Sequence, residues 1–146
     1  MDVQQDWLRF DFFPAGAELI VQGAQVDGTL MVLKEGEVEV LRDGKFVSAI
    51  RQPGAIFGEM SVLLDRPHSA TVRAVTDVQL YVIDDALQVL EQHPAWLLQI
   101  ARLLAQRVNA TTAQLVALKQ KQGDPDDDEV LVLPTNVFAS WSDPQI

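Results

Sequence analysis

The pattern of apolar and polar positions predicts short strands over the first part of the chain. From about residue 12 to residue 84, brief apolar and β-branched runs alternate with glycine-containing turns, which is typical of an antiparallel sandwich or barrel. The dipeptide Asp43-Gly44 lies between two runs and predicts a tight hairpin. Residues 2–10, ahead of these strands, predict a short helical turn whose apolar members are Trp7, Leu8 and Phe10.

Residues 71–83 alternate between apolar and polar side chains with a period of two. This period places the apolar members on one face of an extended chain and the polar members on the other. We therefore expect one face to point toward a core and the other toward water. The apolar face consists of Val72, Ala74, Val78, Leu80 and Val82, and the polar face of Arg73, Asp77 and Gln79.

After residue 83 the apolar period becomes helical, and two helices are predicted. Asp84 or Asp85 is suited to cap the first, short helix through its side chain. His93-Pro94 begins the second helix, because proline is tolerated in a first turn. The second helix is expected from about residue 94 to residue 122 and is roughly 40 Å long.

The long helix carries a heptad repeat, in which apolar spacings of four and three residues alternate. A second apolar row lies beside the first, and a helix that is apolar over so wide an arc is usually covered on two sides. The pattern favours a homodimer formed through this helix, with a broad core stripe in a monomer as the alternative. The seam is Leu97, Ala101, Leu104, Val108, Thr111, Leu115 and Leu118, and the second row adds Leu98, Ala105 and Thr112.

The length of 146 residues suits one domain with a single core. The domain is predicted over residues 1–122, with the roll at about 12–84 and the helices at about 85–122. Residues 123–146 are predicted as an acidic linker, centred on residues 126–129, and an apolar tail. The apolar residues of the tail are Val130, Leu131, Val132, Leu133, Phe138 and Trp141.

Composition and charge exclude several classes of site. The chain has no cysteine, and its two histidines are far apart in sequence, so no metal site is expected. The start of the chain lacks a secretion signal, and no apolar run reaches the roughly 18 residues that span a bilayer. We therefore expect a cytoplasmic protein without a membrane partner. A net charge of −10 opposes DNA binding but is compatible with one small anion in a pocket.

The most specific motif lies at residues 57–74 and reads FGEMSVLLDRPHSATVRA. It resembles the phosphate-binding cassette of cyclic-nucleotide-binding domains, which occur in the catabolite activator protein and in regulatory subunits of cAMP-dependent protein kinase. The resemblance covers about residues 12–120. It implies an α+β fold, namely an antiparallel β-roll (jelly roll) with short flanking helices and a long C-terminal dimerisation helix. Other family marks occur in order, at Phe13-Pro14 with Gly16, Gln22-Gly23, Gly36 and Pro53-Gly54.

The resemblance also implies a site for a cyclic nucleotide. Gly58 would permit close approach of the backbone, whose N–H groups would meet the phosphate. The Glu59 carboxylate would accept a hydrogen bond from a ribose hydroxyl, and Ser69 or Ala70 would supply further phosphate contacts. The candidate ligand-binding residues are Phe57, Gly58, Glu59, Met60, Ser61, Arg66, His68, Ser69 and Ala70.

The sequence departs from the family pattern at the residue that supplies the positive charge for the phosphate. An arginine nine residues after the glutamate normally binds the phosphate bidentately, and here that position is His68. Histidine is mostly neutral at pH 7 and has no fork of donors. Replacing a charge-assisted pair by one neutral hydrogen bond costs roughly 1.5–3 kcal/mol or more of binding free energy. The corresponding loss of affinity is about ten- to several-hundred-fold.

Each candidate residue has a structural alternative. His68 is either the cation for the phosphate or an exposed loop histidine. Arg66 either turns inward as a substitute cation or stays in solvent. Glu59 either binds the ribose or pairs with a nearby arginine, and Ser69 either contacts the phosphate or caps a local turn.

The chain shows no nucleophile elbow, zinc-protease helix or Walker loop, so we expect no enzyme, no catalytic residue and no cofactor. The last residues are too few and too acidic for a DNA-binding helix-turn-helix. We predict a stand-alone, homodimeric sensor of a cyclic nucleotide or another small anion that signals to a partner protein. The alternative is a ligand-free module of the same fold, used for dimerisation or protein docking.

Overall fold

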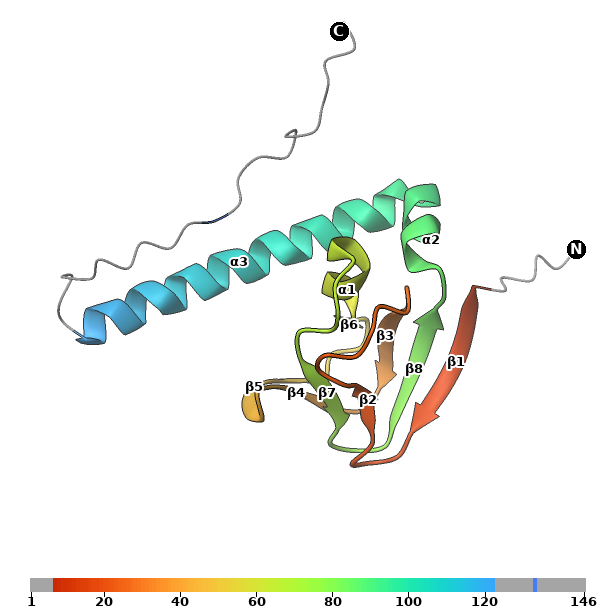
Figure 1. The fold of residues 1–146 in the computed structure, drawn as a ribbon, viewed down its shortest axis with the longest axis horizontal. Coiled ribbons are helices and arrows are strands. Elements are labelled where there is room, and N and C mark those ends of the chain that lie inside the picture. The colour runs from red at the N-terminus through yellow and green to blue at the C-terminus, as the bar shows by residue number, and fades with distance from the viewer. Residues whose placement is uncertain (1–6, 123–132, 134–146) are drawn as a thin grey trace, which may run out of the picture. The chain divides into compact units, whose positions relative to one another are not determined.

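A computed structural model describes residues 7–122 and residue 133. The described chain contains eight strands and three helices, coloured along the chain in Figure 1. The described residues divide into two units between residues 101 and 102, and we describe the two units separately. In chain order the elements are β1 Leu8–Phe13, β2 Glu18–Ile20, β3 Leu30–Glu35, β4 Val38–Arg42, β5 Lys45–Ile50, β6 Ile56–Phe57, α1 Glu59–Leu64, β7 Thr71–Ala74, β8 Val78–Ile83, α2 Ala86–Gln92 and α3 Pro94–Gln122.

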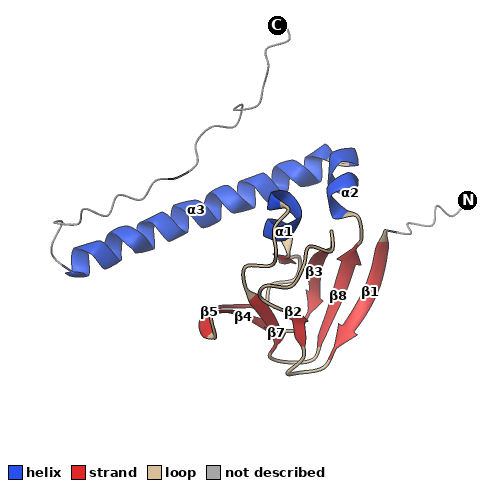
Figure 2. Cartoon of the chain, viewed as in Figure 1, coloured by secondary structure: helices blue, strands red, loops and turns tan. Residues whose placement is uncertain are grey.

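The strands form two four-stranded sheets, drawn as red arrows in Figure 2. The first sheet has the order β1-β8-β3-β6 and the second has the order β2-β7-β4-β5. Every pairing within the two sheets is antiparallel. The prediction of an antiparallel β-roll in an α+β fold is therefore confirmed.

The core lies between the two sheets and draws on both. The alternation predicted for residues 71–83 is confirmed, because its apolar members are all buried while Asp77 and Gln79 are exposed. However, β7 belongs to the second sheet and β8 to the first. The turn between them keeps an even spacing from Ala74 to Val78, so one apolar face is continuous across both sheets. The main core cluster is Leu19, Ile20, Leu33, Val38, Phe57, Val72, Ala74, Val78, Leu80 and Val82.

Two turns depend on the left-handed backbone region. Asp43 and Gly44 join β4 to β5 with φ angles of 54° and 77°, as the predicted two-residue hairpin requires. Gly36 joins β3 to β4 with a φ of +109°. A Cβ at Gly36 would lie 2.5 Å from the carbonyl oxygen of Asp77, so this turn packs directly against the start of β8.

The helical turn predicted over residues 2–10 is wrong for its described part. Residues 8–13 form β1, which pairs with β8 in the register Leu8↔Ile83 to Phe13↔Val78. The partner strand is about 70 residues further along the chain, so a local pattern carries no sign of it. Pairing of backbone groups along this edge outweighs the weak local preference for a helical turn. Residues 2–6 of this prediction lie outside the described residues.

The two predicted helices are present as α2 and α3, with α3 at the expected bounds. Asp85 is the N-cap of α2, in the left-handed region with a φ of 49°, but its side chain makes no capping hydrogen bond. Asp84 instead binds Arg9 on β1. The predicted side-chain cap of α2 is therefore wrong. The Asp84 carboxylate binds Arg9 instead, and the left-handed backbone conformation of Asp85 keeps its carboxylate from capping the helix.

The second unit is described through its part of α3. Within that part the seam residues Val108 and Leu118 are 59% and 56% exposed, and Leu115 is half-buried. The predicted linker and most of the apolar tail lie outside the described residues. None of the described helices is both long and apolar enough to cross a membrane.

Candidate ligand-binding site

The cassette begins where β6 ends and α1 starts. Gly58 is the N-cap of α1 with a φ of 85°, and its carbonyl accepts a hydrogen bond from the N–H of Val62 at 3.2 Å. A Cβ at Gly58 would lie 3.1 Å from the carbonyl oxygen of Thr29 and 3.8 Å from Cε1 of His68. Gly58 is thus a turn glycine, and its bare backbone lies beside the His68 ring.

The short helix α1 turns polar side chains inward. Glu59 and Ser61 are 6% and 4% exposed, whereas Met60 between them is 47% exposed. Phe57, just ahead of the helix, belongs to the core cluster. The Ser61 hydroxyl is buried and has no hydrogen-bond partner among the described residues. Buried polar groups nearly always have a hydrogen-bond partner, so the lack of one at Ser61 requires an explanation.

His68 is buried and firmly held. Its side chain is 8% exposed. The backbone N–H of His68 donates to the carbonyl of Ala24 at 3.0 Å, and the backbone carbonyl of His68 accepts from the N–H of Gly23 at 2.8 Å. The alternative of an exposed loop histidine is therefore wrong. The local sequence around His68 is polar and turn-like, and the β2–β3 loop that covers it comes from a distant part of the chain.

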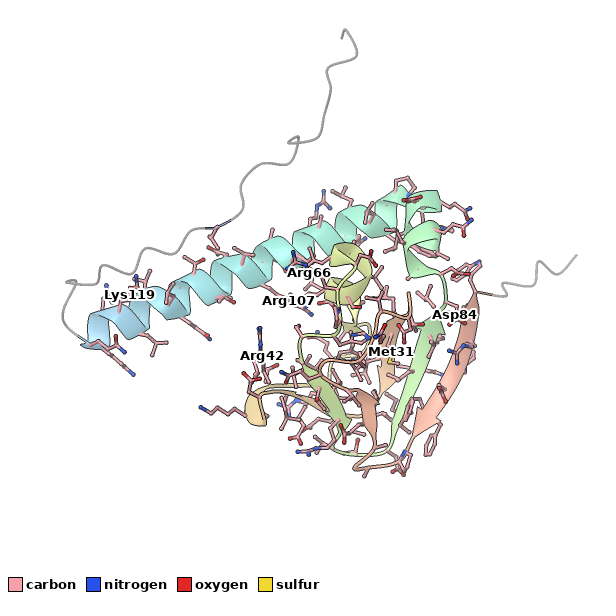
Figure 3. The ribbon with its side chains drawn as sticks, in the orientation of Figure 1. Met31, Arg42, Arg66, Asp84, Arg107 and Lys119 are labelled. Atoms are coloured by element: carbon pink, nitrogen blue, oxygen red, sulfur yellow. The ribbon has the colours of Figure 1, made fainter. Side chains whose placement is uncertain are left out.

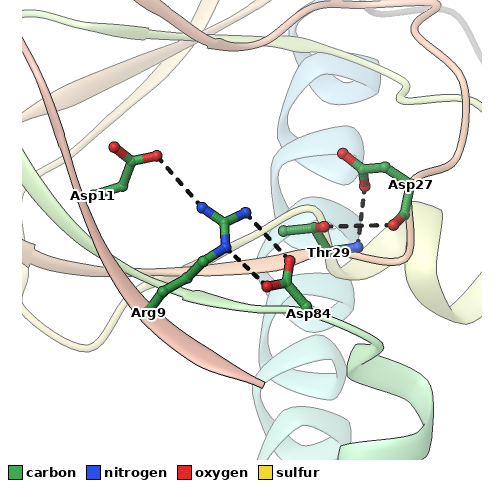
Figure 4. Close-up of polar contacts among 5 residues, drawn as sticks. All are labelled: Arg9, Asp11, Asp27, Thr29 and Asp84. Carbon is green, nitrogen blue, oxygen red and sulfur yellow. Dashed lines mark hydrogen bonds and ion pairs between the residues drawn. The ribbon is translucent and has the colours of Figure 1, made fainter. Parts of the chain in front are cut away.

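A carboxylate faces His68 from that same loop. Asp27 Oδ1 lies 4.0 Å from His68 Nε2. The same oxygen accepts a hydrogen bond from the backbone N–H of Thr29 at 3.0 Å, as Figure 4 shows. The Asp27 side chain remains 59% exposed. Sequence reasoning missed Asp27, since nothing in its local pattern connects it to a residue 41 positions later.

The remaining cassette residues are more open. Arg66, labelled in Figure 3, follows α1 and is exposed. Among the described residues it forms no ion pair, as the alternative of a solvated side chain expects. Ser69 and Ala70 are half-buried at the entry to β7. The structure thus brings His68 to Gly58 and leaves Arg66 on the outside.

A polar clamp fixes the loop that faces the cassette. The Gln22 N–H donates to Thr71 Oγ1 at 2.9 Å. The Gln22 side-chain amide donates to Asp43 Oδ1 and accepts from the Asp43 N–H, both at 2.8 Å. Gln22 directly precedes Gly23, which bonds to the backbone of His68. The β4–β5 hairpin, the β2–β3 loop and the cassette are therefore tied together by a continuous set of hydrogen bonds.

A second ion pair stands beside the Asp27 loop and is also drawn in Figure 4. Arg9 Nε donates to Asp84 Oδ2 at 2.8 Å, and Arg9 Nη2 donates to Asp84 Oδ1 at 3.2 Å. The hydrogen bond from Arg9 lowers the pKa of Asp84, and the same contact raises the pKa of Arg9. The pair links β1 to the end of β8.

The described part of the chain offers no group of three or more histidine, aspartate or glutamate side chains placed to hold a metal ion. The chemistry available in the cassette is therefore hydrogen bonding and charge. It comprises a buried carboxylate at Glu59, a buried hydroxyl at Ser61 and a buried imidazole at His68. The donors and acceptors of this set are suited to a small polar molecule.

Comparison with known proteins decides the family. The profile of the family described as "Cyclic nucleotide-binding domain" matches residues 10–93. The chain belongs to the cyclic nucleotide-binding domain family. The matched range contains the whole cassette and nearly all of both sheets.

Known relatives and solved structures are consistent with this family. The cGMP-dependent protein kinase egl-4 of Caenorhabditis elegans is 37% identical over 65 residues, which is 44% of this chain and 8% of the kinase. A cGMP-dependent protein kinase of Drosophila melanogaster is 32% identical over 72 residues, 49% of this chain and 6% of the kinase. The chain thus spans less than a tenth of these kinases.

Among solved structures, the Thermus thermophilus catabolite activator protein has a TM-score of 0.68 and 28% identity, covering 77% of this chain and 55% of that chain. A cyclic nucleotide-binding domain from Methylobacillus flagellatus has a TM-score of 0.65 and 23% identity, covering 76% of this chain and 67% of that chain. The second likeness concerns the fold alone.

Proposed function

We propose that this chain is a nucleotide-sensing regulatory module that binds a cyclic nucleotide in the cassette and is not itself an enzyme. The observation that carries the proposal is the burial of His68 against Gly58, at the position where the family has its arginine. The likeness to cGMP-dependent protein kinases supports the ligand class. Protonated His68 would supply the cation for the cyclic phosphate.

The other buried groups of the cassette fit the ribose. Glu59 is a buried carboxylate that would accept a hydrogen bond from a ribose hydroxyl. The Ser61 hydroxyl, which has no partner among the described residues, would gain one from the ligand. Ser69 and Ala70 would offer backbone N–H groups to the phosphate, and the exposed Arg66 lies outside this set.

The module is proposed to act as a homodimer through α3 and to signal to a partner protein in the cytoplasm. Exposed apolar side chains at heptad spacing, among them Val108 and Leu118, support the dimer. The net charge of −10 and the scattered basic residues oppose DNA as a partner. The absence of sequence-specific DNA binding stays a prediction.

Calorimetric titration of the full chain with cyclic AMP and with cyclic GMP tests the proposal. We expect binding of a cyclic nucleotide, and a loss of affinity in Glu59→Gln, which keeps the shape of the side chain but removes its charge. Glu91→Gln, the same change at an exposed position on α2 outside the cassette, is the matched control. Absence of heat, chemical-shift change and thermal stabilisation with either ligand at millimolar concentration, including for His68→Arg, would refute the sensor.

One observation favours a second candidate, a ligand-free docking module of the same fold. Asp27 already places a carboxylate beside His68, so an internal anion is available to the imidazole without any ligand. If the chain is such a module, no variant binds a cyclic nucleotide. Its function is then dimerisation and docking to a partner protein.

A further inference from the structure

The outer face of the first sheet carries a row of apolar side chains, one from each strand. Phe10 on β1 pairs with Tyr81 on β8, Tyr81 with Val32 on β3, and Val32 with Ile56 on β6. Their neighbours along β8, Leu80 and Val82, point into the core, so alternation puts the row on the opposite face. We call Phe10, Tyr81, Val32 and Ile56 the outer row.

The outer row is open to solvent at its β1 end. Phe10 is 64% exposed, and Phe12, two residues along the same face, is 57% exposed. On this face the next row toward α2 contains Leu30 and Ile83, which are only 2% and 8% exposed. The apolar surface therefore continues from a part that the described residues cover to a part that they leave exposed. The outer face of an antiparallel sheet is normally polar, so the exposed part points to a partner.

A single cation belongs to the outer row. The Lys34 ammonium lies 5.0 Å from the centre of the Phe10 ring and 5.9 Å from that of Tyr81. The two rings are themselves 4.7 Å apart. Within the described residues no carboxylate lies at ion-pair distance from Lys34. The row thus has aromatic surface and one positive charge without an internal counter-ion.

We infer that the outer row binds an amphipathic α-helix of a partner protein, with one carboxylate of that helix placed against Lys34. The inference deepens the proposed function, on which it rests, by giving the regulatory module its partner-facing surface. Four strands spaced about 4.8 Å apart make a row of roughly 14 Å. At 1.5 Å per residue, that length matches about ten residues of helix, or nearly three turns. A helix lying on a sheet face is the usual second layer of such a fold.

Charge selects one feature of the helix. Lys34 favours an acidic residue of the partner beside the apolar stripe. The proposed occupant is therefore an amphipathic helix with a glutamate at the edge of its leucine stripe.

A designed peptide tests this surface on the full chain. The probe is a helix of about 14 residues with leucines at i, i+3, i+4 and i+7, uncharged polar residues outside, and one glutamate beside the stripe. Fluorescence anisotropy should show binding that Phe10→Ser weakens about tenfold or more. Phe46→Ser, at a phenylalanine of the other sheet that is 62% exposed, should leave the affinity unchanged. Lys34→Glu should weaken binding of this peptide and strengthen binding of its glutamate-to-lysine version.

Several results would overturn the inference. They are failure of the peptide to bind at millimolar concentration, an equal effect of Phe46→Ser, and a Lys34→Glu variant without the swap in charge preference. Self-association that Phe10→Ser abolishes would identify a second copy as the occupant instead, and binding to lipid vesicles through Phe10 would identify a membrane. If a cyclic nucleotide binds and the peptide does not, the proposed docking surface is wrong and the proposed function stands. If the peptide binds and no cyclic nucleotide does, the proposed sensor function is wrong and the docking surface stands.

Discussion

Asp27 and His68 face each other across the candidate site, with Asp27 Oδ1 4.0 Å from His68 Nε2. The carboxylate accepts a hydrogen bond from the backbone N–H of Thr29, and the backbone of His68 is hydrogen-bonded to the backbone of Gly23 and Ala24. This arrangement places an imidazole in the site together with an internal anion that would compete with a bound phosphate. Two predictions follow from these two residues.

Replacement of His68 by arginine should strengthen the binding of a cyclic nucleotide. Arginine stays charged and presents a fork of donors to the phosphate. His68→Arg should therefore raise the affinity at pH 8 by about tenfold or more in a calorimetric titration. If Arg66→Ala abolishes binding and His68→Arg changes little, Arg66 is the cation instead.

Removal of the Asp27 charge should help an anionic ligand. In Asp27→Asn the imidazole no longer faces a carboxylate, so the phosphate meets no competing anion. We expect the affinity for cyclic AMP or cyclic GMP to rise a few-fold at low ionic strength, and the gain to shrink in high salt. Asp85→Asn changes the net charge equally at an exposed position outside the cassette and serves as the control. An equal gain in both variants would show a general charge effect and no special role for Asp27.

The Arg9–Asp84 pair should make a small contribution to stability that depends on pH. The hydrogen bond from Arg9 lowers the pKa of Asp84 from its ordinary value of 3.8. The stabilisation is therefore present above that value and is lost as the pH falls through the lowered pKa. Because both side chains are partly exposed, Asp84→Asn should cost only about 0.2–1 kcal/mol of unfolding free energy at pH 7. Urea denaturation should show this difference at pH 7 and its disappearance near pH 2, whereas Asp85→Asn should show little difference at either.

The turn at Gly36 should not tolerate a side chain. A Cβ there would lie 2.5 Å from the Asp77 carbonyl oxygen and 2.6 Å from Cγ1 of Val78, at a φ of +109°. Gly36→Ala should lower the unfolding free energy by about 3 kcal/mol or more, from overlap and backbone strain together. Gly44→Ala, at a φ of +77° with nothing within 4 Å, should cost only about 1–2 kcal/mol. Equal losses in urea denaturation would contradict the close packing of Gly36.

The seam on α3 should control the oligomeric state. Val108 is 59% exposed in one chain, so Val108→Glu should leave the fold of the monomer intact. In a homodimer the charge would be buried against its copy, and the dimer should dissociate at micromolar concentration. Gln106→Glu, away from the seam, is the control. Light scattering that gives a monomer for the wild type at high micromolar concentration would contradict the dimer itself.

Local pattern predicted much of this fold because the signals involved are local. The bounds of α3 follow from Pro94 and a helical period. The β4–β5 hairpin follows from Asp43-Gly44, and the buried face of residues 71–83 follows from alternation. The same reasoning failed at residues 8–10, where the apolar spacing also fitted a helical turn. There the pairing of β1 with β8 decided the structure.

The cassette was located from the sequence because its residues are contiguous and their types carry its chemistry. Whether His68 was exposed or buried was not readable, since its burial depends on the β2–β3 loop closing over it. Asp27 and the clamp of Gln22 to Asp43 were missed for the same reason. The sequence by itself determined the elements other than β1, the family resemblance and the missing arginine, all of which depend on neighbouring residues. Only the tertiary structure decided which distant groups face His68 and which apolar side chains remain uncovered, because burial and proximity depend on how distant segments pack.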